Sequence, residues 1–297
     1  MYDNDKMTLL KFIYNKLTSK YWTIGFSDYK DITKLQFSEI KWIEEIPGEW
    51  FADPFILDYD DYTITVLVEY VIDPDPLGKI AKFVIDRQSF KIISKTIILS
   101  LPTHLSFPVI VRKNDGIFFY PENSASGELN VYKLNADATG CVKVATLVNA
   151  PLTDAIIFKH EDTYIMTATI EPGSNGNHMQ IYTSDKEFGS YKLKEDKYLS
   201  NNTARNAGYT LKKSDGLYYK ISQENDVPIY GHGMVFYEIS PDLKYMKEVN
   251  RIQPEKGFIG VHTMNPYNTL IAWDGKKYRY PFIAKWINII SKMIGKL

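Results

Sequence analysis

The sequence predicts an all-β protein built as a five-bladed β-propeller, and three observations support this prediction. Short apolar stretches, each with a polar residue at or near its start, recur at intervals of roughly 50 residues, a period typical of propeller blades. Most are followed by a turn rich in Asp, Asn and Gly and then by a second strand, as in a β-hairpin. The 22 Tyr and 15 Phe fit a β-rich fold, in which aromatic side chains pack across strands.

The apolar stretches supply the expected inner strands of the blades. They lie at 50–57, 106–111, 154–158, 206–211 and 262–265. In a propeller the first strand of each blade lines the central channel. We therefore expect one funnel to collect Asp53, Ser106, Asp154, Arg205 or Asn206, and His262, and such convergence is what a functional site requires.

The chain ahead of the first blade is expected to form a helix and a lead-in. Residues 7–20 have the spacing of a short basic amphipathic helix, and 22–42 are expected to form a lead-in strand and loop. The Ile46-Pro47-Gly48 turn then opens the first blade. This reading divides the chain into a helix and lead-in at 1–45, a propeller at 46–280 and a C-terminal helix at 281–297.

The later blades follow in order. The second is led in by 101–104 and carries a strand at 129–134; the third begins at Asp154, and its polar loop at 171–177 is expected to rim the funnel. The fourth starts at Arg205 and meets a glycine turn at 230–233. The fifth follows His262, and Asp274-Gly275 and Pro281 mark the passage to the terminal helix.

Composition excludes several classes of function. A formal net charge of -1 gives no electrostatic basis for binding nucleic acid. The five histidines show no spacing typical of a zinc site, and the single cysteine, Cys141, cannot form an internal disulfide. Lysines interrupt the N-terminal apolar residues, and no stretch approaches the ~20 apolar residues of a spanning helix, so we expect a cytoplasmic protein.

The segment 282–297 predicts a cationic amphipathic helix. Its apolar residues, Trp286 among them, share one side, Lys285, Lys292 and Lys296 lie off that side, and the helix contains no acid. Two interpretations stay open. Such a helix has the composition of a peripheral membrane anchor, which would place the protein at the inner face of the membrane, and it equally suits a helix packed on the body.

A set of short motifs, in order along most of the chain, resembles a known family. The motifs are Trp22-Thr23-Ile24-Gly25, Phe51-Ala52-Asp53-Pro54-Phe55, Val68-Glu69-Tyr70, His104-Leu105-Ser106-Phe107-Pro108, Pro121-Glu122-Asn123, Thr153-Asp154-Ala155, Ala204-Arg205-Asn206-Ala207-Gly208, Gln223-Glu224, Tyr230-Gly231 and His262-Thr263. They resemble the propeller domain at the N-terminus of plant glucosamine inositolphosphorylceramide transferases, found also in bacterial proteins encoded with surface-polysaccharide enzymes. That domain is similar to the five-bladed arabinanase, β-xylosidase and levansucrase superfamily. Asn206, Lys220 and Glu224 depart from the expected proline, arginine and aspartate.

The resemblance implies catalytic roles for two aspartates. Asp53 matches the aspartate that acts as base or nucleophile in the superfamily's hydrolases, and Asp154 matches the one that orients and stabilises. The third hydrolase residue is a glutamate that protonates the leaving group, and here Arg205 stands at or near its place. A phosphate leaves without protonation and is stabilised by arginine. We therefore expect a glycosyltransferase of surface glycan, capsule or glycolipid assembly, with Arg205 on the phosphate of a nucleotide-linked or phosphate-linked donor and Asp53 as base toward a glycan or lipid-linked acceptor.

Two other functions stay open. A glycoside hydrolase would need Glu122 or Glu224 as the acid, and a propeller without catalysis would only bind glycan. By resemblance, His104 and His262 would contact sugar hydroxyls or phosphate, and Ser106, Gln223 and Tyr230 would join them in binding substrate. We expect no cofactor, with a divalent cation between Asp53 and Asp154 left open.

Overall fold

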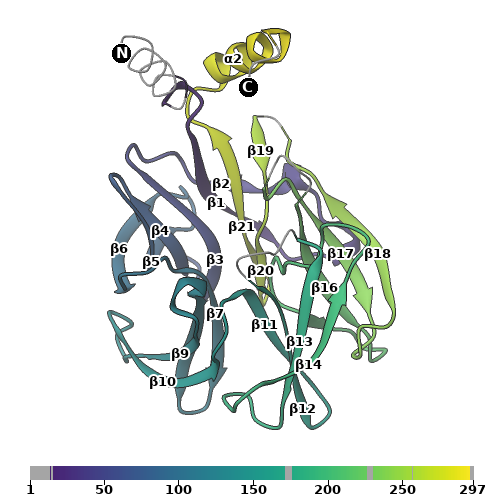
Figure 1. Cartoon of the computed structure of the whole chain (residues 1–297). Coiled ribbons are helices and arrows are strands. Elements are labelled where there is room, and N and C mark those ends of the chain that lie inside the picture. The colour runs from purple at the N-terminus through teal and green to yellow at the C-terminus, as the bar shows by residue number, and fades with distance from the viewer. Residues whose placement is uncertain (1–13, 15, 171–175, 226–229, 256, 295–297) are drawn as a thin grey trace, which may run out of the picture.

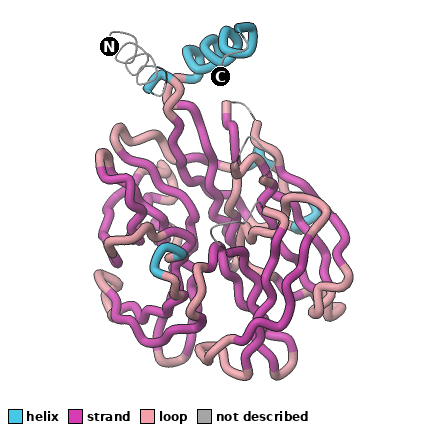
Figure 2. The backbone as a smooth tube through the Cα atoms, in the orientation of Figure 1, coloured by secondary structure: helices cyan, strands magenta, loops and turns pink. Residues whose placement is uncertain are grey.

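A computed structural model of the chain describes residues 14, 16–170, 176–225, 230–255 and 257–294. Five antiparallel sheets are arranged around a common axis (Figure 1), and strands make up nearly all of the regular structure (Figure 2). The prediction of an all-β, five-bladed propeller is confirmed. The predicted helix at 7–20 and the predicted rim loop at 171–177 fall largely outside the described residues.

Each of the first four blades is a four-stranded meander. The first contains β3 (Glu49–Tyr59), β4 (Thr63–Ile72), β5 (Asp75–Asp86) and β6 (Ile92–Leu99); the second β7 (Ser106–Lys113), β8 (Gly116–Glu122), β9 (Leu129–Leu134) and β10 (Cys141–Val148). The third contains β11 (Leu152–His160), β12 (Thr163–Ile170), β13 (His178–Ser184) and β14 (Lys192–Tyr198); the fourth β15 (Leu211–Lys212), β16 (Tyr218–Glu224), β17 (Gly233–Ile239) and β18 (Met246–Ile252).

The fifth blade joins the two ends of the chain. It contains β19 (Phe258–Gly260), β20 (Met264–Tyr267) and β21 (Leu270–Tyr278) together with β1 (Lys20–Asp28) and β2 (Lys41–Trp42). β1 pairs with β21 along its whole length, from Lys20 opposite Tyr278 to Asp28 opposite Leu270. Part of the segment expected to lead into the propeller therefore belongs to it, and this pairing closes the ring.

Burial falls from the axis outward, which explains why the inner strands were recognisable as apolar runs. In the third blade, the inner strand β11 is mostly buried, whereas the outermost strand β14 is mostly exposed. Neighbouring blades meet through large apolar side chains near the axis. Phe55 of the first blade packs edge-to-face on Phe107 of the second, with ring centroids 5.2 Å apart.

The short 3-10 turns η1 (Ile32–Lys34) and η2 (Phe37–Glu39) lie between β1 and β2, and η3 (Ser124–Ser126) follows β8. The helix α2 (Pro281–Ile294) follows β21 and is the short C-terminal helix that the sequence predicts. None of the helices in the described part of the chain is both long and apolar enough to cross a membrane.

At Gly208 the backbone of the fourth blade lies very close to the backbone of the fifth. A Cβ atom added there would lie 2.0 Å from the carbonyl oxygen of Met264 and 2.9 Å from Oδ1 of Asn265. We expect Gly208→Ala to lower the free energy of unfolding by about 1–3 kcal/mol or more, because backbone would have to move. The measurement is urea unfolding. Gly140→Ala is the control, since its Cβ would meet only Asn135 at 3.6 Å; equal effects of the two substitutions would contradict the expectation.

Candidate functional site

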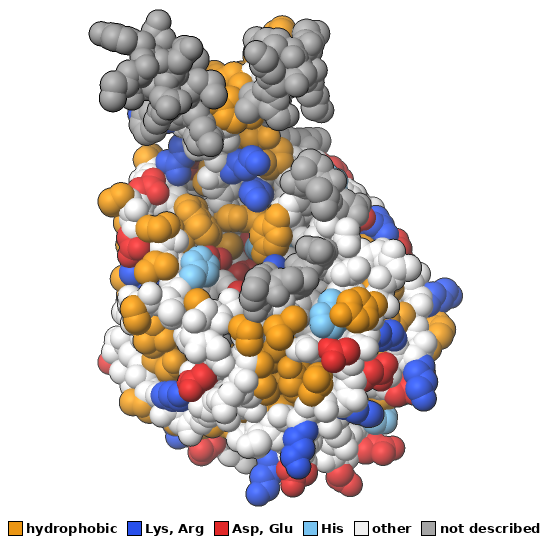
Figure 3. Space-filling view, viewed as in Figure 1, with side chains coloured by type: hydrophobic (Ala, Val, Ile, Leu, Met, Phe, Trp, Pro, Cys, Tyr) orange, Lys and Arg blue, Asp and Glu red, His pale blue; other side chains and the backbone are white. Residues whose placement is uncertain are grey.

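A hollow on one face of the molecule, called the funnel below, has acidic side chains at its bottom and hydrophobic side chains at its edge (Figure 3). The bottom is built by the inner strands of several blades. Asp53 comes from β3, Asp154 from β11, and His262 from the segment just before β20. Each of these three residues is buried. Segments far apart in the sequence thus meet at one place.

The same backbone irregularity occurs in the first three blades. A one-residue β-bulge interrupts each inner strand, between Ala52 and Phe55, Ser106 and Val109, and Thr153 and Ile156. Within the bulges Asp53, Phe107 and Asp154 have positive φ, at 49°, 46° and 47°. Aspartate tolerates this conformation, whereas for a bulky residue it is strained. The structural equivalent of Asp53 and Asp154 in the second blade is therefore Phe107, where the sequence pattern suggested Ser106.

Asp53 is held by groups from the second and fifth blades. Its Oδ2 accepts a hydrogen bond from the backbone N–H of Phe107 at 3.1 Å, and its Oδ1 accepts one from the hydroxyl of Thr263 at 2.5 Å. Burial raises the pKa of Asp53 to about 8, against an opposing effect of His262. Repulsion from nearby acids, Asp154 among them, adds to the increase. Asp53 is therefore suited to exchange a proton near neutral pH.

Asp274 organises the fifth-blade side of the site. Its Oδ1 accepts hydrogen bonds from the backbone N–H groups of His262 and Thr263, each at 2.9 Å, and its Oδ2 lies 2.5 Å from Nδ1 of His262. Burial opposes the charged imidazole, but Asp274 and Asp53 outweigh it and raise the pKa of His262. From the sequence, Asp274-Gly275 serves only as a marker ahead of the terminal helix. In the structure both residues lie inside β21.

Asp53, His262 and Asp274 each offer a potential metal-ligand atom, and these atoms lie within 4.8 Å of one another. Both oxygens of Asp274 already accept hydrogen bonds from protein N–H groups, and Nδ1 of His262 points to one of them. A cation would have to displace these contacts. We therefore do not base the reaction on a metal, and the cation considered between Asp53 and Asp154 stays a prediction.

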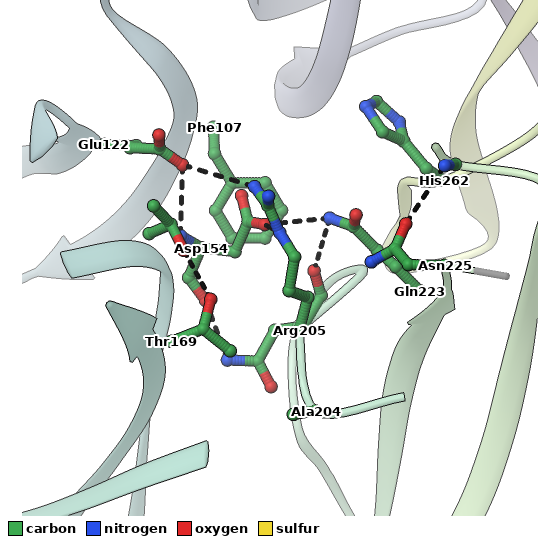
Figure 4. Close-up of polar contacts among 12 residues, drawn as sticks. Phe107, Glu122, Asp154, Thr169, Ala204, Arg205, Gln223, Asn225 and His262 are labelled. Carbon is green, nitrogen blue, oxygen red and sulfur yellow. Dashed lines mark hydrogen bonds and ion pairs between the residues drawn. The ribbon is translucent and has the colours of Figure 1, made fainter. Parts of the chain in front are cut away.

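Asp154 lies in a second cluster with Arg205, Gln223 and Glu122 (Figure 4). Its Oδ2 accepts hydrogen bonds from Nε of Arg205 at 2.7 Å and from Nε2 of Gln223 at 2.9 Å. Oε2 of Glu122 accepts a hydrogen bond from the backbone N–H of Asp154 at 3.2 Å and lies 3.9 Å from Nη2 of Arg205. The Arg205 side chain is only 12% exposed. The guanidinium is therefore turned inward, between two carboxyl groups.

The surroundings of Glu122 disfavour a negative charge, and those of Arg205 favour its positive charge. Burial, and then repulsion from Asp154, raise the pKa of Glu122 well above its usual range, although Arg205 opposes the shift. For Arg205, burial disfavours the charge, but Asp154 and other neighbours outweigh it and raise its pKa. The ion pair between Arg205 and Asp154 thus accounts for most of the charge in this cluster, and Glu122 tends to remain protonated.

Asn206 and Lys220, two of the departures from the family pattern, are linked to Asp154 by hydrogen bonds: Asn206 bonds to Asp154, and Lys220 bonds to Asn206. The Asn206 side chain donates to the carbonyl oxygens of Asp154 and Thr167 at 2.7 and 2.8 Å. Its Oδ1 accepts a hydrogen bond from Nζ of Lys220 at 2.6 Å. Burial lowers the pKa of Lys220 to about 7, against an opposing effect of Asp154. The departures are thus parts of one buried network.

Aromatic rings and cations connect the two clusters. The Trp22 ring stacks on His262 with centroids 3.9 Å apart, and the Tyr230 ring meets His262 edge-on at 5.5 Å. Tyr230 also has two cations near its ring, the guanidinium of Arg205 at 5.2 Å and the ammonium of Lys276 at 5.5 Å. Among the described residues, none has a carboxylate within ion-pair distance of Lys276. Burial lowers the pKa of Lys276 to about 8, so Lys276 is mostly protonated at neutral pH and is a second cation besides Arg205.

His104 lies toward the first blade. Its Nε2 is 2.9 Å from Oε1 of Glu69, and its Nδ1 accepts a hydrogen bond from the backbone N–H of Gly78 at 3.0 Å. The hydrogen bond with Glu69 raises the pKa of His104 despite burial. Because the Glu69 carboxyl also acts on the pKa of Asp53, His104 borders the same site.

Ser106 and Glu224 do not belong to either of the two clusters described above. Ser106 is buried beside the bulge and pairs with Glu122 across the sheet. The Glu224 carboxylate contacts Arg251 and Gln253, which lie on or just after the outer strand β18. Its charge is therefore engaged away from the axis. Of the two acids considered for a hydrolase, only Glu122 lies beside Asp154.

Sequence reasoning missed several contributors: Trp22, Glu69, Thr263, Asp274 and Lys276. Trp22, Glu69 and Thr263 were visible only as members of the matched motifs. The pairing of β1 with β21 places Trp22 opposite Lys276, and a pairing of residues more than 200 positions apart leaves no local signal.

Comparison with known proteins gives a consistent result. A family model described as "Glucosamine inositolphosphorylceramide transferase 1, N-terminal" matches residues 39–283. Glucosamine inositolphosphorylceramide transferase 1 of Arabidopsis thaliana is 26% identical over 189 residues, which are 60% of this chain and 24% of that protein. The chain thus spans about a quarter of the length of this curated relative.

Similar solved structures are glycoside hydrolases. The α-L-arabinofuranosidase PaAbf62A from Podospora anserina, in complex with cellotriose, has a TM-score of 0.55 at 8% identity, over 86% of this chain and 97% of that one. An exo-β-1,3-galactanase from Phanerochaete chrysosporium with galactose has a TM-score of 0.53 at 10% identity, over 70% and 53% of the two chains. The enzyme of the same name from Clostridium thermocellum has 0.51 at 12%, over 79% and 59%. At these identities the likeness shows the fold alone.

Proposed function

We propose a function for this chain from the premise that it belongs to the family of glucosamine inositolphosphorylceramide transferase 1 N-terminal domains. The proposed function is transfer of a glycosyl group from a phosphate-activated sugar donor. The observation that carries the proposal is the position of Arg205. Its guanidinium is buried, with Nε 2.7 Å from Oδ2 of Asp154, at or near the place where the hydrolases that the sequence resembles have their proton-donating acid. A guanidinium stabilises a leaving phosphate and cannot protonate a leaving alkoxide.

The charges around the funnel favour an anionic donor. Arg205 and Lys276 lie on the same aromatic ring, that of Tyr230, and the pKa of His262 is raised. The raised pKa values of Asp53 and Glu122 reduce the negative charge that these acids carry near neutral pH. A phosphate or diphosphate entering the funnel would therefore meet cations and partly neutral acids.

Asp53 is assigned the role of base toward the acceptor. A base works best when its pKa lies near the working pH, and burial brings the pKa of Asp53 to about 8. In the proposed step Asp53 takes the proton from an acceptor hydroxyl, the acceptor oxygen bonds to the anomeric carbon, and the phosphate departs with the bonding electrons toward Arg205. Asp154 orients Arg205, and Gln223 orients Asp154. The acceptor is assigned to the class of glycans or lipid-linked glycans.

Hydrolysis is the second candidate, and Glu122 is the observation that favours it. Its raised pKa keeps a proton available near neutral pH, and it lies beside Asp154 and Arg205. Glu122 would then protonate the leaving oxygen, and water would replace the acceptor.

The deciding experiment incubates the purified chain with a panel of nucleotide-linked sugars, and separately with simple aryl glycosides, and follows product by NMR. The proposal expects release of nucleotide or phosphate that depends on an added glycan acceptor, and no cleavage of the aryl glycosides. Cleavage of an aryl glycoside that is lost in Glu122→Gln would establish the hydrolase instead. Binding of glycan without any turnover, unchanged in Asp53→Asn, would identify a propeller that only binds.

A further inference from the structure

The helix α2 leaves three large apolar side chains exposed. Figure 1 shows the helix standing clear of the blades beyond the end of β21. Ala284 is its one fully buried side chain among those described, whereas Phe282 is 82%, Trp286 66% and Ile283 43% exposed. The helix thus buries the small residue Ala284 and leaves Phe282, Ile283 and Trp286 exposed.

Helical geometry makes this arrangement specific. At 3.6 residues per turn, Phe282, Ile283 and Trp286 lie on one side of the helix, and Ala284 lies roughly opposite. A helix that serves only to cover its own protein buries its apolar side. In α2 the apolar side with Phe282, Ile283 and Trp286 is exposed and the opposite side, with Ala284, is buried. Packing of the helix on the body therefore does not explain why these three residues are apolar.

The charge of α2, and of the surface near its first residues, indicates which kind of partner would bind it. From 281 to 297 the sequence has Lys285, Lys292 and Lys296 and no acid. At the base, Lys16 and Lys20 are exposed and line a recess with Arg279, Tyr280 and Asp73. Arg279 lies 3.5 Å from Glu45. Figure 3 shows Lys and Arg side chains just below α2. After these two acids are counted, the region still carries an excess of positive charge.

We propose that α2 lies in the surface of an anionic lipid membrane. Phe282, Ile283 and Trp286 enter the boundary between headgroups and acyl chains, and Lys285 and Lys20 meet the lipid phosphates. A second copy of the chain could cover the same apolar side, but it would bring like-charged lysines together, whereas anionic lipid neutralises them. Because the funnel opens on the face seen below α2 in Figure 3, docking sets the funnel beside the lipid surface. The inference does not depend on the proposed reaction.

The test is co-sedimentation of the full chain with vesicles of phosphatidylcholine alone or mixed with phosphatidylglycerol. We expect binding only to the mixed vesicles, weakened by added salt. Trp286→Ser together with Phe282→Ser should lower the affinity at least about tenfold, and Lys285→Glu should lower it by about tenfold as well. Tyr62→Ser is the matched control, because Tyr62 is 79% exposed on the β3–β4 turn and lies outside the proposed surface.

Three outcomes would overturn the proposal. One is no binding to the mixed vesicles by a chain that is folded by circular dichroism. Another is equal binding to both vesicle types, which would remove the role of charge. The third is a dimer in gel filtration that Trp286→Ser dissociates, which would show that a second copy covers the helix.

Discussion

Asp53→Asn is expected to abolish turnover and at the same time to stabilise the fold at alkaline pH. Loss of a general base typically costs 10²- to 10⁴-fold, so kcat/KM should fall by at least about 10²-fold. The fold should gain because burial penalises the charged carboxylate. An amide has the size of the protonated acid, can still accept a hydrogen bond from Thr263, and never ionises.

The sign of the pH dependence follows from the direction of the shift. The folded-state pKa of Asp53 is raised from 3.8 to about 8, so its contribution to stability is fully present below about pH 4 and is lost as the pH rises through 8. The variant has no such loss. Its unfolding temperature should therefore exceed that of the wild type above pH 8, by an amount equivalent to several kcal/mol, and the difference should shrink toward pH 4.

The control for this prediction is Asp58→Asn, which changes an exposed aspartate of the same strand. It should leave both turnover and the pH dependence of unfolding unaltered. Full activity in Asp53→Asn would remove Asp53 from the mechanism. An unfolding temperature lower than the wild type at every pH would show that the hydrogen bonds of Asp53 outweigh the cost of its burial.

Arg205→Met is expected to lower donor turnover by about 10²- to 10³-fold and to destabilise the protein by about 3–5 kcal/mol. The first effect follows if the guanidinium stabilises the leaving phosphate. The second follows because Asp154 is left as a buried charge without its partner 2.7 Å away. Binding of pyrophosphate, measured by isothermal titration calorimetry, should be lost in the variant, and this readout does not depend on the acceptor.

Two comparisons separate the effects. The double variant Arg205→Met with Asp154→Asn should regain much of the lost stability without regaining activity, since both charges are removed together. Arg251→Met is the matched control, because Arg251 also pairs with a buried acid, Glu224, but lies on the outer strand. Donor turnover that survives in Arg205→Met would contradict a phosphate role for this residue.

The family and the architecture could be predicted from the chain because both leave local marks. The inner strands are buried on both sides, so they appear as apolar runs, and their turns carry Asp, Asn and Gly. The comparisons and the structure confirm the resemblance and the five blades. The closing pair of β1 and β21 could not be predicted, because each strand alone has the same pattern whether it pairs with its neighbour or with the far end of the chain.

The site divides in the same way. Asp53, Asp154 and Arg205 were found because each lies at or near the start of an apolar stretch. Ser106 was chosen over Phe107 because the pattern shows a polar residue but not the β-bulge that shifts the register by one. Glu224 was considered as an acid because nothing in its own segment shows that Arg251 engages it.

By itself the sequence determined which segments become inner strands, because burial and turn chemistry act on neighbouring residues. Only the tertiary structure decided which side chains face one another: the pairing of Arg205 with Asp154, the hold of Asp274 on His262, and the outward side of α2. The first two are contacts between residues 51 and 12 positions apart, and the third depends on where α2 meets the body, so no local pattern records any of them.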